Sequence, residues 1–99
     1  VEVKIYDLST SKDKTISDMD GVVVPGGADI NPEFYFPAIE AELIEYTKSL
    51  NHYVDYSEEG KRRDPFEFKL LQDYFRNDNL SDLPVLGICR GMQMLAVSQ

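Results

Sequence analysis

Cysteine, histidine and tryptophan are scarce in this chain of 99 residues, which holds one cysteine, one histidine and no tryptophan. A single cysteine cannot form an intrachain disulfide, and this suits a reducing compartment. We therefore expect a cytoplasmic protein. Nothing in the composition calls for a cofactor, and none is expected.

Basic residues are also few, because 10 lysines and arginines stand against 18 acidic residues, for a formal net charge of −8. Nucleic-acid binding needs clustered basic side chains, and the single cluster, Lys61-Arg62-Arg63, is short and follows Glu58-Glu59. No apolar run approaches the ~20 residues that span a bilayer, and the chain does not open on a signal peptide. We expect neither nucleic acid nor membrane as a partner. The composition leaves a homodimer open.

Two segments near the start have strand patterns. Residues 1–6, "VEVKIY", alternate apolar and polar side chains, which predicts a half-buried strand. Residues 22–24 are three valines followed by Pro25 and two glycines. Such a run is typical of a strand buried on both faces.

The middle of the chain is expected to be helical. Apolar residues recur on one stripe between residues 37 and 50. Residues 51–63 have no sustained period and are expected to form a loop. A second helix is predicted from Asp64 as N-cap, with Pro65 at the first helical position and Glu67 three residues after the cap.

A last strand over residues 85–88 and a helix from residue 90 complete the predicted order. Strands and helices in this order indicate an α/β fold with a mainly parallel sheet. The chain begins inside its first predicted strand and ends inside its last predicted helix. We therefore expect residues 1–99 to be a segment of a single domain roughly twice as long.

The cysteine lies in "GICRG", where Gly87 and Gly91 flank Cys89 at the junction of the last strand and helix. This is the nucleophile-elbow pattern with cysteine in place of serine. Two such glycines around a given cysteine arise by chance in roughly 1 case in 200. A helix N-terminus favours the thiolate, and the N–H of the residue after the nucleophile can receive an oxyanion. The alternative is a small buried cysteine without a catalytic role.

Three blocks, "DGVVVPGGADINPEFY", "RRDPFEFKLLQDYF" and "LPVLGICRGMQMLAVSQ", resemble the gamma-glutamyl-gamma-aminobutyrate hydrolase family. That family belongs to the class I glutamine amidotransferase-like superfamily. The resemblance implies a flavodoxin-like three-layer sandwich, incomplete in this chain. It also implies an enzyme that cleaves γ-glutamyl amide bonds through a covalent intermediate on cysteine.

The resemblance assigns roles to five residues. Cys89 matches the nucleophile, and the backbone N–H groups of Gly27 and Arg90 match the two halves of the oxyanion hole. Gly26 lets the substrate approach the main chain, and Gln93 matches a residue that contacts the glutamyl group. Taken without the cysteine motif, the two glycines would be an ordinary turn, and Gln93 an exposed helix residue.

The family's general base is a histidine that follows the cysteine, and no histidine follows Cys89 here. His52 precedes it, and we interpret His52 as a loop residue. A thiol without a base has no proton acceptor, so the 99 residues alone are expected to be inactive. A different class of function also stays open, a non-catalytic or redox-sensing flavodoxin-like module whose reactive cysteine is oxidised.

Two polar stretches have several interpretations. Asp29, Asn31 and Glu33 follow the glycines; they lack histidine or cysteine partners for a metal, so capping the next turn or lining the site entrance is favoured. Lys61-Arg62-Arg63 could receive a substrate carboxylate, but a solvated loop is the favoured interpretation.

Overall fold

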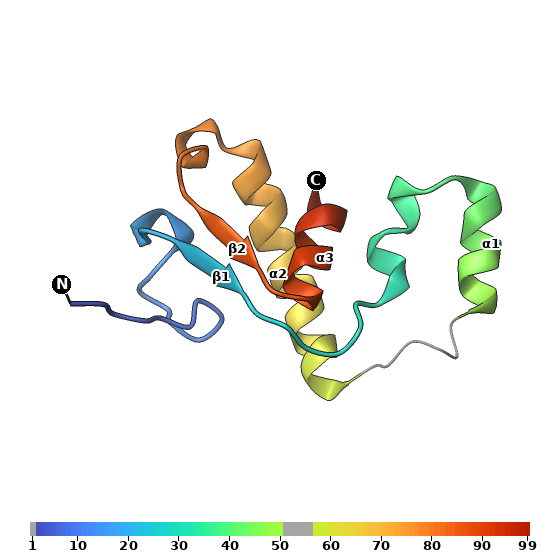
Figure 1. Ribbon diagram of the computed structural model, residues 1–99, viewed down its shortest axis with the longest axis horizontal. Coiled ribbons are helices and arrows are strands. Elements are labelled where there is room, and N and C mark those ends of the chain that lie inside the picture. The colour runs from blue at the N-terminus through green and yellow to red at the C-terminus, as the bar shows by residue number, and fades with distance from the viewer. Residues whose placement is uncertain (1, 51–56) are drawn as a thin grey trace.

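A computed structural model of the chain describes residues 2–50 and 57–99 (Figure 1). Two parallel strands, β1 (Val22–Val24) and β2 (Val85–Gly87), pair with Val23 opposite Leu86. The long helix α2 (Glu58–Arg76) precedes β2 in the chain, and α3 (Arg90–Ser98) begins shortly after β2 ends. The predicted α/β class with a parallel sheet is confirmed, and the two strands correspond to part of a flavodoxin-like fold.

Shorter elements join these parts. In the described part of the chain, 3-10 turns have the bounds η1 (Ile16–Asp18), η2 (Pro32–Phe34), η3 (Phe36–Ala38) and η5 (Asp78–Leu80). Helix α1 (Ala41–Ser49) lies away from the sheet (Figure 1). No helix among the described residues is both long enough and apolar enough to cross a bilayer.

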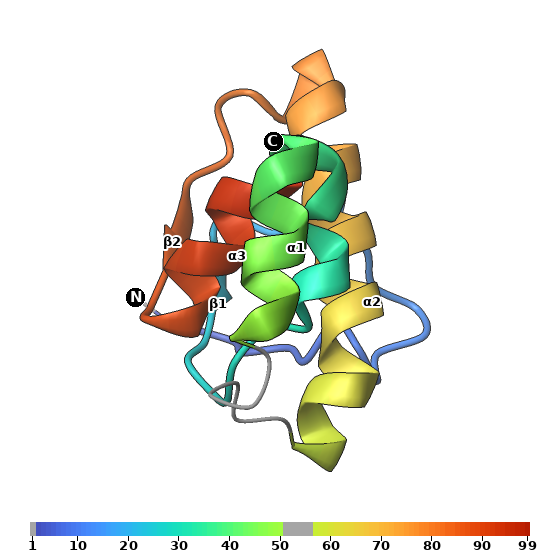
Figure 2. The ribbon, with the colours of Figure 1, turned by 90° about the vertical axis from the view of Figure 1, so that its right-hand side faces the viewer.

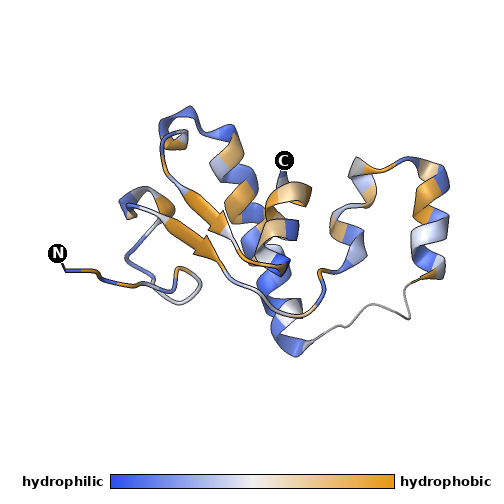
Figure 3. Cartoon of the chain, viewed as in Figure 1, coloured by the Kyte–Doolittle hydropathy of each residue, from blue (hydrophilic) through white to orange (hydrophobic). Residues whose placement is uncertain are grey.

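The core lies on one face of the sheet. Val24 packs there with Ile30, Leu71 and Met94, and α3 lies between β2 and α2 (Figure 2). The strands are continuous hydrophobic segments (Figure 3). On the other face, however, the side chain of Val23 is 58 % exposed. The expectation that residues 22–24 are buried on both faces is therefore wrong, because no described element covers the Val23 face.

Two other predictions near the start and middle of the chain are corrected. Residues 2–6 form no strand, and Ile5 is 91 % exposed, because no described segment pairs with them. The helix predicted between residues 37 and 50 is present as α1, preceded by η3. Its apolar stripe is exposed at Leu43 and Tyr46, so the stripe does not contribute to the core.

The start of α2 also differs from the prediction. Ser57 is the N-cap, and its side chain accepts a hydrogen bond from the backbone N–H of Gly60 (2.9 Å). Residues 58–63 are therefore helical rather than a loop, and Pro65 lies inside the helix. Asp64 is buried and does not cap. Its carboxylate binds other partners, which belong to the site described next.

Candidate active site

Cys89 occupies a sharp turn between β2 and α3. Its backbone has φ 55° and ψ −110°, and it is the one non-glycine residue with positive φ in the described part of the chain. Such a conformation is strained for a side chain with a Cβ and is held only when the surroundings determine it. The backbone N–H of Ile88 donates to Val24 (2.9 Å) before the turn, and Met92 donates to the carbonyl of Cys89 (3.0 Å) after it. Cys89 itself is exposed.

The glycines on either side of Cys89 are required by close packing. A Cβ on Gly91 would collide with the backbone carbonyl of Val24 in β1. A Cβ on Gly87 would lie 2.7 Å from the backbone nitrogen of Met92. Neither backbone atom can move without moving a strand or a helix. Small residues at both positions allow α3 to start directly against the sheet, as the sequence pattern predicted.

The glycine loop after β1 lies beside this turn. A Cβ built on Gly26 would be 3.6 Å from the Cβ of Cys89, and one built on Gly27 would be 3.4 Å from Cδ of Arg90. Four of the five predicted site residues, Gly26, Gly27, Cys89 and Arg90, therefore come together. No hydrogen bond with another described residue uses the backbone N–H of Gly27 or Arg90.

Gln93 lies one turn further along α3. Its backbone N–H donates to the carbonyl of Cys89 (3.2 Å), and its side chain is exposed. A helical spacing of four residues places positions 89 and 93 on the same side of α3. Its contact with a substrate stays a prediction.

The side chain of Arg90 has partners that no local pattern in the sequence indicates. It is 1 % exposed, and its guanidinium binds two carboxylates of α2. Nη1 donates to Oε2 of Glu67 (2.5 Å), and Nη2 donates to Oδ1 of Asp64. Burial lowers the pKa of the guanidinium, but the hydrogen bonds that it donates to Glu67 and Asp64, together with their negative charges, outweigh burial and raise the pKa above its usual value. Arg90 therefore stays charged, as its two carboxylate partners require.

Arg63 extends this group toward the glycine loop. Its Nη2 donates to Oε1 of Glu67 (2.9 Å) and to the carbonyl of Pro25 (2.9 Å), and its Nη1 donates to the carbonyl of Gly26 (2.7 Å). We call Arg63, Asp64, Glu67 and Arg90 the charge cluster. Two guanidinium groups and two carboxylates give it a formal charge of zero. All four residues are largely or fully buried, with side chains no more than 12 % exposed.

The charge cluster corrects the interpretation of Lys61-Arg62-Arg63 as one solvated loop. Lys61 and Arg62 are exposed and pair with Glu58 and Glu59 on the same helix. Arg63 instead faces inward. The signal in the sequence was the block "RDPFE", whose three charged residues all belong to the cluster, together with the arginine after the cysteine.

The polar stretch after the glycines takes part in the structure of the loop. The side chain of Asn31 caps η2 by accepting from the backbone N–H of Glu33 (3.0 Å). The backbone N–H of Asn31 donates to Oδ2 of Asp64 (2.9 Å). The capping interpretation is confirmed for Asn31.

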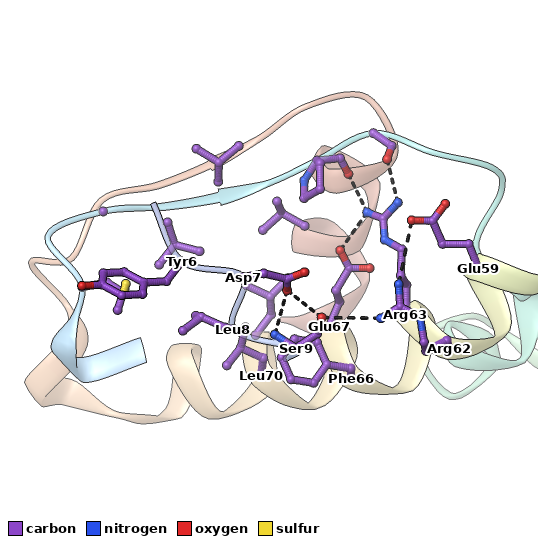
Figure 4. Close-up of a pocket in the computed structure, with 18 residues that line it drawn as sticks. Tyr6, Asp7, Leu8, Ser9, Glu59, Arg62, Arg63, Phe66, Glu67 and Leu70 are labelled. Atoms are coloured by element: carbon purple, nitrogen blue, oxygen red, sulfur yellow. Dashed lines mark hydrogen bonds and ion pairs between the residues drawn. The ribbon is translucent and has the colours of Figure 1, made fainter. Parts of the chain in front are cut away.

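A cavity of about 410 Å³ lies behind the glycine loop, between α2, β1 and the N-terminal segment. Arg63 and Glu67 point into it from α2, and residues 6–9 border it from the N-terminal segment (Figure 4). Gly26 lines the cavity, but Cys89 does not. The exposed side of Cys89 therefore lies outside this cavity. His52, the single histidine of the sequence, lies outside the described residues.

Comparisons with known proteins identify the family of the chain. The peptidase C26 family profile matches residues 2–99. The chain belongs to the peptidase C26 family. It is also 36 % identical to a glutamine amidotransferase-like protein of Rickettsia prowazekii (strain Madrid E) over 80 aligned residues, and the alignment covers 80 % of this chain. The chain spans 22 % of that relative's length. No solved structure matches the chain.

Proposed function

We propose that this chain provides the nucleophile and the oxyanion hole of an enzyme that hydrolyses γ-glutamyl amide bonds, as in the gamma-glutamyl-gamma-aminobutyrate hydrolases that its sequence resembles. The observation that carries the proposal is the strained backbone of Cys89, exposed at the start of α3 and adjacent to Gly26. A nucleophile at a strand-to-helix turn next to free backbone N–H groups is the arrangement that acyl transfer uses.

In the proposed reaction the thiolate of Cys89 attacks the carbonyl carbon of the γ-glutamyl amide. A carbon–sulfur bond forms, and the carbonyl electron pair moves to the oxygen. The N–H groups of Gly27 and Arg90 would donate to this oxyanion. Collapse of the intermediate breaks the carbon–nitrogen bond, and the leaving amine takes a proton.

Water then attacks the thioester and releases glutamate and the free thiol. The two proton transfers require a base that becomes an acid, the role histidine has in cysteine hydrolases. The described residues supply no histidine for it. Their contribution is attack and charge stabilisation.

The test uses the full product of the gene that carries this chain. γ-Glutamyl-p-nitroanilide and its α-linked isomer present the same leaving group on different carboxyl groups of glutamate. We expect release of p-nitroaniline from the γ-linked compound only, and its loss in Cys89→Ala. Met92→Leu, a change at an exposed position of the same helix, is the matched control and should keep the activity. Undiminished hydrolysis by Cys89→Ala would contradict the proposal.

A further inference from the structure

One turn of α2 is bonded to both ends of the glycine loop. Arg63 donates to the carbonyls of Pro25 and Gly26, at the beginning of the loop. Asp64, the next residue, accepts from the backbone N–H of Asn31, at the end of the loop (2.9 Å). The loop that carries Gly27 is therefore held at both ends by α2.

The same turn also holds the start of α3. Asp64 and Glu67 bind the guanidinium of Arg90, the first residue of α3. Glu67 bridges the two arginines, because one of its oxygens binds Arg63 and the other binds Arg90. Paired guanidinium and carboxylate groups fix orientation as well as distance. Helix α2 thus contributes to the separation between the glycine loop and the start of α3, in addition to the direct contact of β1 with Ile88 and Gly91.

The charge cluster is buried, in contrast to the ion pairs on the surface of the helix. Removing four charges from water is an inefficient way to stabilise a fold, and well-packed apolar residues of similar volume often serve as well. The arrangement does provide geometry. A shift of about 1 Å at a reacting centre can slow a reaction roughly 100-fold.

We propose, on the basis of the function proposed above, that Arg63, Asp64 and Glu67 are positioning residues, which hold the N–H groups of Gly27 and Arg90 at the separation that a tetrahedral oxyanion requires. They act through the glycine loop and through the side chain of Arg90. Their removal should therefore slow reactions of Cys89 that form an oxyanion and spare those that form none.

Two reagents separate these reactions at the same sulfur atom. p-Nitrophenyl acetate acylates the thiol: the carbon–sulfur bond forms, the carbonyl oxygen takes the negative charge, and p-nitrophenolate then leaves. Iodoacetamide alkylates the thiol by direct displacement of iodide, and no oxyanion forms. The ratio of the two rates at Cys89, followed by mass spectrometry of the modified peptide, reports on the oxyanion hole.

The variant Arg63→Lys keeps the positive charge but cannot bind two carbonyls and Glu67 with one planar group. In the full gene product we expect acylation of Cys89 to slow about tenfold or more. Removing an oxyanion donor outright slows a reaction ~100-fold or more. The expected effect is smaller because the donors are displaced but still present. Alkylation should stay nearly unchanged. Lys69→Arg, a swap of basic residues in an exposed pair of the same helix, is the matched control and should change neither rate.

Glu67→Gln provides a second variant, since it keeps the shape of the side chain and removes its charge. Circular dichroism melting verifies that each variant is folded. Unchanged acylation in both variants would overturn the inference, and so would an equal slowing of both reactions, which a purely structural role predicts. If the parent protein were acylated no faster than the Cys89→Ala variant, the proposed function itself would be overturned instead.

Discussion

Helix α2 carries two pairs of opposite charges at the same spacing of four residues, and they differ in their surroundings. Arg63 and Glu67 are 2.9 Å apart, and their side chains are 12 % and 10 % exposed. Lys69 and Asp73 are 4.0 Å apart, with 82 % and 62 % exposed. Arg90 and Asp64 extend the buried pair, Arg63 and Glu67, into the charge cluster, which joins α2, the glycine loop and the start of α3.

The spacing of charges along a helix therefore does not decide whether they stabilise the fold. Water screens the outer pair, and exposed pairs of this kind contribute about 0–1 kcal/mol. Within the protein, each charge of the inner group depends on the others, since an unpaired buried charge costs several kcal/mol. The comparison can be tested by changing one side at a time.

The largest expected effect is that of Arg90→Ala. This change leaves Asp64 and Glu67 buried without their common partner, and we expect the free energy of unfolding to fall by about 3–5 kcal/mol. Lys69→Ala, on the outer side, should lower it by less than about 1 kcal/mol. Urea unfolding of both variants measures the difference. Equal losses would show that the two regions do not differ as described.

The backbone next to Arg90 provides the second test. Gly91→Ala would place a Cβ against the carbonyl of Val24, and overpacking of this kind typically costs about 1–3 kcal/mol. Gly21→Ala, at the other end of β1, would meet Pro84 at 3.7 Å, an ordinary contact, and should be tolerated. Thermal melting compares the two. A stable Gly91→Ala variant would contradict the close packing of α3 on β1.

Salt gives the third test, with a smaller effect. At 1 M ionic strength the screening length is about 3 Å, which weakens exposed pairs but reaches buried ones poorly. We expect the stability difference between the parent and Lys69→Ala to vanish in 1 M sodium chloride. The difference between the parent and Arg90→Ala should persist. If salt removed both, the charge cluster would have to be open to solvent.

The smallest effect concerns an exposed carboxylate outside α2. The hydroxyl of Ser9 donates to the carboxylate of Asp7 (2.6 Å), and so does the backbone N–H of Ser9 (2.9 Å). These two hydrogen bonds, the hydroxyl's being the larger cause, hold the pKa of the Asp7 carboxyl below the usual 3.8. A lowered pKa stabilises the folded state above pH 3.8, and this contribution is lost as the pH falls through the lower value. The parent should therefore be slightly more stable than Asp7→Asn at neutral pH, and the two should converge in acid. A gap that widened in acid would refute this.

Local patterns in the sequence predicted the last strand, the turn at Cys89 and the helix after it, because glycine spacing and apolar runs determine these directly. They misplaced the start of α2, since Asp64 followed by Pro65 has the form of a helix cap. Its actual partners, Asn31 and Arg90, are 33 and 26 residues away, and no local rule indicates them.

The same limit applies to burial. Alternation in residues 1–6 and the apolar stripe of α1 indicate which side chains could be covered, but not whether another segment covers them. The block "RDPFE" contributes to the resemblance to a family, but the sequence alone gives its three charged residues no physical role. Their contacts with Arg90 and with the glycine loop supply that role.

The most direct test of the account is to trap the covalent intermediate. The full gene product is mixed with γ-glutamyl-p-nitroanilide, quenched in acid during turnover, and digested for mass spectrometry. We expect a γ-glutamyl thioester on the peptide that contains Cys89, formed more slowly in Arg63→Lys than in the parent. Turnover with no acyl group on Cys89, or with the acyl group on another residue, would contradict it.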